Sequence, residues 1–152
     1  MIAKYIGKYF CVDTTITPVQ IWAYVPVEGF TRKSTRRGTV YYEKYVDISE
    51  IDKIFDVGFS VCWDGEWCGV FYSAEKNLLS VGTNNRDFAV AHDMEEFERG
   101  TFGCAVSASK FNEYRMYTQD FGAKEKTYTM VSYQEFKALW KQMIAELIPP
   151  RG

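Results

Sequence analysis

The feature that most constrains the fold is a tight turn between two strand-like segments in the middle of the chain. Asp64 and Gly65 separate residues 59–63 from residues 66–72, and both flanking segments are rich in aromatic and β-branched residues. Asp-Gly favours a two-residue type I′ turn, because both turn positions need a positive φ. In the resulting hairpin Trp63 lies opposite Glu66. The face predicted to pack in the core consists of Phe59, Val61, Trp63, Cys68, Val70 and Tyr72.

Most of the remaining sequence also predicts short strands. Residues 19–27 alternate apolar and polar side chains with the period of two that a half-buried strand requires. Residues 2–12 and 39–46 are rich in Tyr, Phe, Ile and Val, which strands favour. Further strands are expected at 78–82, 88–92, 102–108, 113–119 and 127–131.

One long helix is predicted, at the end of the chain. Ser132 and Glu135 have the spacing of a capping box at its start, and Pro149-Pro150 would end it. Its apolar stripe consists of Phe136, Leu139, Trp140, Met143, Ile144 and Leu147. The acidic pairs Asp47/Glu50 and Asp93/Glu96 predict two short helical turns, the first burying Ile48, Ile51, Ile54 and Phe55, and the second ending at Gly100.

These elements predict an α+β fold, mostly antiparallel β: a meandering curved sheet of about 8–9 strands with a C-terminal amphipathic helix and one or two short helical turns. The length of 152 residues predicts a single domain, residues 1–152. A hydrophobic content of 47% argues against a disordered chain. No apolar run reaches the length of a membrane span, and residues 1–8 lack the apolar region of a signal peptide. We therefore expect a cytoplasmic protein with no membrane partner.

The net charge of −2 is an average over unlike parts of the chain. Residues 57–98 contain two basic residues, Lys76 and Arg86, against eight acidic ones, a net charge of −6. The segments on either side carry +1 and +3. If the acidic residues share one face, they create a negative field that attracts a basic partner. They are Asp64, Glu66, Glu75, Asp87, Asp93, Glu95, Glu96 and Glu98.

Catalytic and cofactor motifs are weak in this sequence. The single histidine, His92, ends the predicted strand 88–92, where it could act as a base or a pH-sensitive group, but a structural hydrogen bond is the favoured role. The four cysteines contain no Cys-x-x-Cys pair, so we expect reduced, buried thiols and neither a zinc site nor a Cys-His nucleophile. No phosphate-binding or dinucleotide fingerprint occurs. We expect no enzyme activity, no cofactor and no metal.

A short basic segment stands apart from the acidic block. Arg32, Lys33, Arg36 and Arg37 place four cations within six residues. They could bind phosphate or nucleic acid, extended by Lys4, Lys8 and nearby tyrosines. A pI of about 5.5 argues against a nucleic-acid binder, so a solvated loop between two strands is the favoured interpretation.

The hairpin tip is the most distinctive surface, because Trp63 and Trp67 flank two carboxylates within the acidic block. Tryptophan is enriched in interface hot spots, and rim carboxylates steer a basic partner. We therefore expect a non-catalytic protein-binding domain. Bacterial immunity or inhibitor proteins, which neutralise a basic toxin by occluding its active site, share this profile of size, acidity and absent catalytic motifs. The partner-binding residues are predicted to be Asp64, Glu66, Trp67, Asp93, Glu95, Glu96 and Glu98.

The alternative is a β-barrel-like protein that binds a small ligand in an aromatic pocket. Its walls would be Trp22, Tyr24, Tyr41, Tyr45 and Trp67. The oligomeric state stays open, because an exposed strand edge could pair with its copy.

Overall fold

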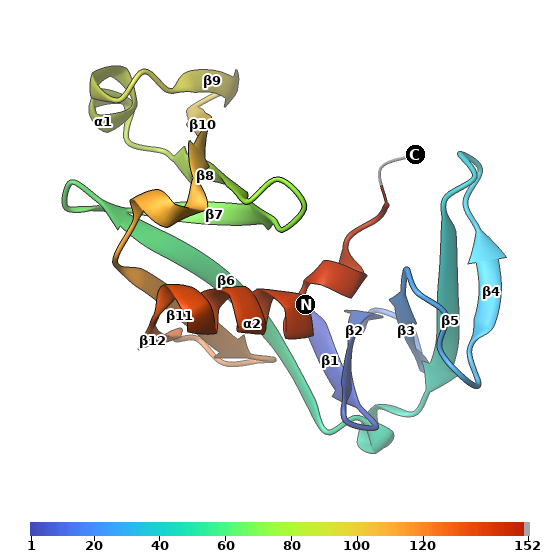
Figure 1. The fold of residues 1–152 in the computed structure, drawn as a ribbon. Helices are drawn as coiled ribbons and strands as arrows, with labels where there is room; N and C mark the ends of the chain where they lie inside the picture. Colours follow the sequence, from blue (N-terminus) through green and yellow to red (C-terminus); the bar gives the residue numbers. More distant parts are fainter. Residues whose placement is uncertain (151–152) are drawn as a thin grey trace. The chain divides into compact units, whose positions relative to one another are not determined.

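The computed structural model describes residues 1–150, which form mostly antiparallel strands with a C-terminal helix (Figure 1). The strands number twelve, not the predicted 8–9. They are β1 (Ile2–Tyr5), β2 (Lys8–Asp13), β3 (Val19–Ala23), β4 (Thr31–Ser34), β5 (Val40–Val46), β6 (Lys53–Trp63), β7 (Glu66–Ser73), β8 (Leu78–Thr83), β9 (Glu95–Glu98), β10 (Thr101–Ser107), β11 (Tyr114–Asp120) and β12 (Thr127–Val131).

Five helical segments interrupt or follow the strands. The two α-helices are α1 (Arg86–Ala91) and α2 (Tyr133–Met143). The 3₁₀ turns are η1 (Ile48–Glu50), η2 (Ala108–Lys110) and η3 (Ala145–Leu147). Within residues 1–150, no helix combines the length and the apolar character needed to cross a bilayer.

The strands pair in the order β4-β5-β3-β2-β1-β6-β7-β8-β10-β9, while β11 pairs with both β6 and β12. This order has two ends, so the sheet does not close on itself. The chain divides into two compact units. Unit 1 comprises residues 1–57, 118–126 and the chain from residue 139 onward, and unit 2 comprises residues 58–117 and 127–138. The predicted single domain stays a prediction.

The hairpin prediction is confirmed by the pairing of β6 with β7. Trp63 lies opposite Glu66, and Val61 lies opposite Cys68. Asp64 and Gly65 adopt φ values of 47° and 85°, as a type I′ turn requires. On the predicted core face Trp63 and Val70 are only half-buried, and the fully buried members are Phe59, Val61, Cys68 and Tyr72.

Unit 2 has its own aromatic core, built around α2 and β11. Phe136 is fully buried, and its ring centroid lies 4.8 Å from that of Tyr114, 5.3 Å from Phe59 and 5.4 Å from Tyr72. The Tyr114 hydroxyl donates a hydrogen bond to the Ala108 carbonyl, and burial raises the pKa of Tyr114 to about 12.

The capping box at the start of α2 is confirmed. The Glu135 N–H donates to Ser132 Oγ at 3.0 Å, and the Ser132 N–H donates to Glu135 Oε1 at 2.9 Å. The helix ends at Met143, earlier than predicted, and the rest of the apolar stripe continues into η3.

Unit 1 packs its own core between β1, β2, β3, β5 and the start of β6. Its most buried members are Ala3, Ile21 and Ala23, with Leu147 of η3 packed against the cluster. The capping box of Asp47 and Glu50 is confirmed at η1. Ile48 is 49% exposed, however, so the predicted burial of this residue is wrong.

Three predicted segments are wrong, wholly or in part, in their secondary structure. Residues 88–92 belong to α1 and its C-cap and not to a strand, because the Asn85 side chain caps the helix by accepting the Phe88 N–H at 3.1 Å. Residues 95–98 form β9 and not a helical turn, since they pair with β10. Of the predicted basic loop, Arg32 and Lys33 lie in β4, which pairs with β5, whereas Arg36 and Arg37 lie in the turn between these two strands, as predicted.

Candidate functional site

Unit 2 contains an open groove of about 910 Å³ on the sheet face formed by β7, β8, β10 and β9. Its lining exposes mainly apolar surface, with polar side chains distributed among the apolar and aromatic ones. The side chains of Leu79 and Val81 are buried, so they point to the opposite face of β8 from Gly82, although Val81 also borders the groove. The lining includes Glu66, Trp67, Gly69, Phe71, Gly82, Asn85, Phe97 and Gly103.

Three glycines in register form the floor of the groove. Gly69 of β7 lies opposite Gly82 of β8, and Gly82 lies opposite Gly103 of β10. These positions carry no side chains. The backbone is free of neighbouring side chains at Gly69 and Gly82, whereas the Phe97 ring lies over Gly103. Glycine within a strand often marks a site where another group approaches the backbone closely. The floor therefore offers a flat surface to a slender or planar group.

Aromatic side chains stand around this glycine floor. Trp67 and Phe71 precede and follow Gly69 by two residues on β7, so all three point to the same face. Phe97 covers the β9 end of the floor, since its Cε1 atom would lie 3.0 Å from a Cβ atom at Gly103. Phe71 is 40% exposed and Phe97 is 64% exposed. Large apolar side chains left open in this way are typical of binding surfaces.

The Trp67 indole is held in place by a cation. The Arg115 guanidinium carbon lies 4.2 Å from the indole centroid and 4.4 Å from the Tyr128 ring centroid. Arg115 Nε also donates a hydrogen bond to Ser60 Oγ at 3.0 Å. A guanidinium stacked on aromatic faces and hydrogen-bonded from one end restricts the rotamers of its neighbours. Arg115 is therefore a positioning residue for this wall of the groove.

The groove contains one carboxylate. Among the described residues that line it, Glu66 alone carries a carboxyl group, and its Oε2 lies 3.5 Å from Asn85 Nδ2. Asn85 is fixed in turn by its role as the N-cap of α1. A carboxylate beside an apolar floor suits a ligand with an apolar body and a cationic or hydrogen-bond-donating end.

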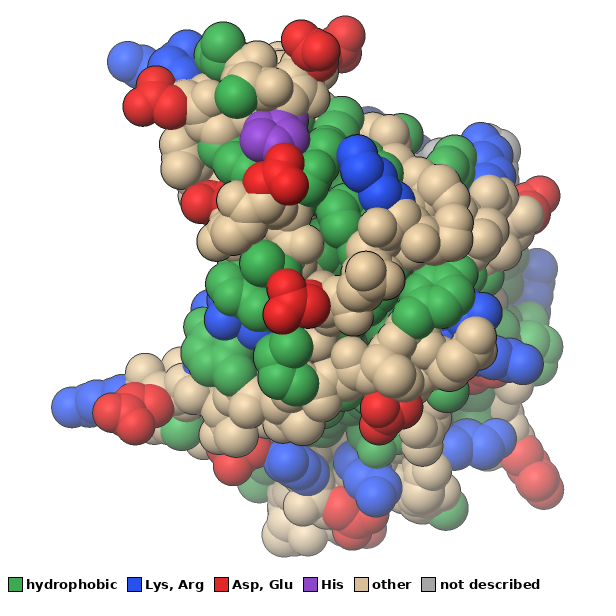
Figure 2. All heavy atoms as spheres, turned by 60° about the vertical axis from the view of Figure 1, so that its left-hand side comes forward, with side chains coloured by type: hydrophobic (Ala, Val, Ile, Leu, Met, Phe, Trp, Pro, Cys, Tyr) green, Lys and Arg blue, Asp and Glu red, His purple; other side chains and the backbone are tan. Residues whose placement is uncertain are grey.

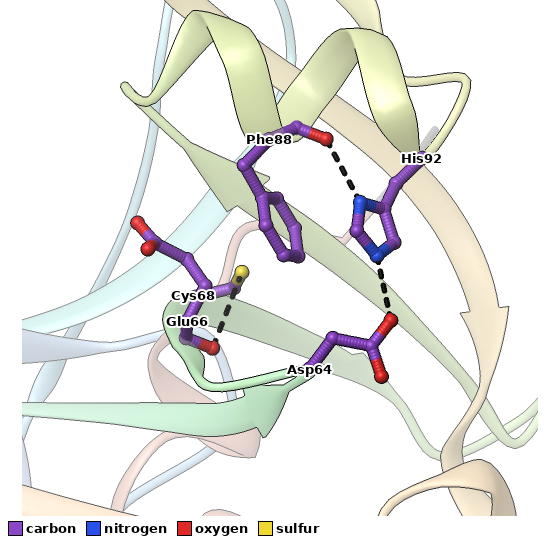
Figure 3. Close-up of polar contacts among 5 residues, drawn as sticks. All are labelled: Asp64, Glu66, Cys68, Phe88 and His92. Carbon is purple, nitrogen blue, oxygen red and sulfur yellow. Dashed lines mark hydrogen bonds and ion pairs between the residues drawn. The ribbon is translucent and has the colours of Figure 1, made fainter.

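The hairpin tip is tied to the end of α1 by the single histidine (Figure 3). His92 Nε2 lies 2.8 Å from Asp64 Oδ2, and its Nδ1 lies 2.9 Å from the Phe88 carbonyl oxygen. The imidazole also stacks on Phe88, with ring centroids 3.8 Å apart. The hydrogen bond to Asp64, and then that to Phe88, raise the pKa of His92 above its ordinary value. In Figure 2 the purple histidine lies at the surface beside a red carboxylate.

All seven predicted partner-binding residues belong to unit 2, but they occupy four different places. Glu66 and Trp67 line the groove, whereas Asp64 lies at the hairpin tip against His92. Asp93 follows α1, exposed and with a φ of 53°. The remaining three are the exposed residues Glu95, Glu96 and Glu98 of β9.

Two of the acidic side chains are already paired. Asp64 bonds to His92, and Glu96 Oε2 lies 3.4 Å from Arg86 Nη2. Within residues 1–150, Glu66, Asp93, Glu95 and Glu98 make no ion pair. These four carboxylates are the ones free to meet a cation from another molecule.

The aromatic residues of the alternative pocket divide between the two units: four share one face of the β3–β5 pair in unit 1, and Trp67 belongs to unit 2. Trp22, Tyr24, Tyr41 and Tyr45 belong to unit 1, and none of them lines the groove. Tyr45 is 51% exposed. Trp67 is the one of the five that lines the groove, and the β-barrel-like ligand binder with a pocket walled by all five residues stays a prediction.

The four cysteines are free thiols, and only Cys68 is fully buried. Burial raises the pKa of Cys68 to about 11 and raises the pKa of Cys11 and Cys104 as well. These three side chains are therefore protonated near neutral pH, which makes them weak nucleophiles.

Sequence reasoning missed the groove floor and most of its walls. Gly82, Gly103, Phe71, Phe97 and Arg115 were not predicted site residues. The available signal was glycine inside segments predicted as strands, but only strand pairing shows that the three glycines meet. Comparisons with protein-family models, with curated proteins and with solved structures find no match to this chain.

Proposed function

We propose that this chain is a protein-binding module, and that the groove of unit 2 takes an extended basic segment of a partner protein. The observation that carries the proposal is the open groove with a glycine floor, which is free of side chains at Gly69 and Gly82 and is walled by Trp67, Phe71 and Phe97. Aromatic walls supply most of the binding energy in such sites, because they bury a large apolar area with few rotatable bonds.

The charge of unit 2 supports a basic partner. Its residues include six basic and ten acidic side chains, a net charge of −4. Glu66 lines the groove itself, and the unpaired Glu95 and Glu98 belong to β9, the strand that also supplies Phe97. A field of this sign steers a cationic segment toward the surface and speeds its association.

The most specific form of the proposal is a non-catalytic inhibitor of the bacterial immunity type. The partner would be a basic toxin, and its cationic substrate-binding segment would enter the groove, so that substrate is excluded. The small size and the acidic unit 2 support this form.

A second candidate is a small-ligand binder that uses the same groove. A volume of about 910 Å³ lies within the range of small-molecule sites, and the flat glycine floor would suit a planar ring. Here Glu66 and Asn85 would orient the ligand by hydrogen bonds.

Selection from a random peptide library against the purified chain tests the proposal. We expect enriched peptides to combine lysine or arginine with an aromatic or aliphatic residue. Glu66→Gln should weaken the selected peptides roughly three- to tenfold, because it removes the groove carboxylate but keeps the side-chain shape. Glu113→Gln is the matched control, since Glu113 is an exposed acid that does not line the groove.

Enrichment of acidic peptides, or equal effects of the two substitutions, would contradict the basic-segment proposal. If no peptide is enriched while small planar aromatic compounds shift the amide resonances of Gly69 and Gly82, the second candidate replaces the first.

A further inference from the structure

The sheet ends in two unpaired edges. β4 is the first strand in the pairing order and β9 is the last. Within residues 1–150 each of them pairs with a neighbour on one side only. Each is four residues long, and every residue of both strands is exposed. An edge strand of this kind presents unpaired N–H and C=O groups to any strand that can lie beside it.

The two edges carry opposite charge. β4 contains Arg32 and Lys33, and the turn that follows adds Arg36 and Arg37. β9 contains three glutamates among its four residues. Within residues 1–150 no ion pair is formed by Arg32, Lys33, Glu95 or Glu98. These exposed charges are therefore available to a charge of opposite sign on another molecule.

The sign of the charges selects which edges can pair. Two copies of β4, or two copies of β9, would bring like charges face to face, which destabilises a strand pair. β4 beside β9 places cations against carboxylates, which stabilises it. The charges therefore permit one combination of edges and oppose the other two.

We propose that the β9 edge of one copy accepts β4 of a second copy as an added strand. This inference goes beyond the proposed function, because it uses the backbone edges and assigns a role to the basic segment that the groove does not explain. The contact is heterologous, so it leaves a free β4 and a free β9 at the two ends of every assembly and can add further copies. Four-residue strands bury little area, so the association is weak and concentration-dependent.

Sedimentation equilibrium of the full chain tests the proposal. The weight-average mass should rise from the monomer value of 17.6 kDa to twice that or more between ~10 μM and ~1 mM at low salt. It should return to the monomer value near ~0.5 M salt, where exposed charges are screened within a few ångströms. Mass that stays at the monomer value throughout at low salt would overturn the proposal.

Charge reversal identifies the surfaces. Arg32→Glu with Lys33→Glu should abolish association, and so should Glu95→Lys with Glu98→Lys, which leaves the Glu96–Arg86 pair intact. An equimolar mixture of the two double variants should associate again, as should one chain carrying all four substitutions. Glu75→Lys with Lys76→Glu is the control, because both residues lie in the exposed turn between β7 and β8. Association that survives either double reversal, or that the mixture fails to restore, overturns the proposal.

Hydrogen exchange separates strand pairing from charge attraction alone. Amides of β4 and β9 should exchange at least several-fold more slowly at ~1 mM than at ~10 μM, because new backbone hydrogen bonds protect them. If the chain associates but the amide exchange rates of β4 and β9 do not change, strand addition is overturned. The peptide-binding test of the groove does not depend on this outcome.

Discussion

At the scale of single residues, the contact between His92 and Asp64 has the clearest chemical consequence. Both ring nitrogens face acceptors, a carboxylate and a carbonyl, so the doubly protonated imidazole satisfies both contacts at once. Lys110 opposes this, because its charge lowers the pKa of His92, but the two hydrogen bonds prevail and the net shift is upward. The side chain of His92 is 17% exposed, whereas that of Asp64 is 72% exposed. Solvent therefore screens part of the attraction.

The contact should make stability depend on pH. A histidine whose pKa is higher in the folded state contributes stability that is complete below its unfolded pKa of about 6.5 and disappears as the pH rises through the folded pKa. Asp64→Asn removes the carboxylate but keeps an Asn-Gly turn, which also accepts a positive φ. We expect the melting temperature of the wild type to exceed that of Asp64→Asn most at about pH 5.5 and the difference to shrink by about pH 8.5.

Thermal unfolding of both chains across this pH range measures the effect. His92→Gln serves as a second variant, and its difference from the wild type should follow the same trend. A melting-temperature difference that is constant with pH, or that grows toward alkaline pH, would contradict the claim that the His92–Asp64 ion pair stabilises the fold.

At the scale of elements, the predictions that held depend on local chemistry. The β6–β7 hairpin follows from Asp64-Gly65, and the start of α2 follows from Ser132 and Glu135, because these residues fix the backbone with their immediate neighbours. β4 and β9 are rich in charge and carry no strand pattern, and they are strands because β5 and β10 lie beside them. Pairing with a distant strand cannot be read from a local pattern.

The packing of α2 in unit 2 depends on one aromatic side chain. Phe136→Ala should lower the free energy of unfolding by about 3–5 kcal/mol, because Phe136 is fully buried among Phe59, Tyr72 and Tyr114 and its removal leaves a cavity. Urea unfolding followed by circular dichroism measures the change. Val90→Ala in α1, where Val90 is 71% exposed, is the control and should change it by less than about 0.5 kcal/mol. Equal losses in the two variants would contradict this account of the core.

At the scale of the whole molecule, the sequence predicted the acidic region and only part of the groove. Glu66 and Trp67 were predicted from the hairpin tip, and both line the groove. The groove itself required three glycines from β7, β8 and β10 to meet, although Gly69 and Gly103 lie 34 positions apart in the sequence. The function is a proposal that rests on this geometry and on the charge of unit 2.

The affinity of a selected basic peptide for Gly69→Leu tests the central claim most directly. Gly69 has no positive φ, and no atom lies within 4 Å of a Cβ built there, so the backbone accepts a side chain and leucine would extend into the groove. Thr129→Leu adds a similar side chain to exposed β12, away from the groove, and controls for surface apolarity. We predict that Gly69→Leu binds the peptide at least about tenfold more weakly than the wild type, a loss of about 1.4 kcal/mol, with its melting temperature unchanged, while Thr129→Leu binds normally. Wild-type affinity in a folded Gly69→Leu chain would contradict the claim that this groove is the binding site.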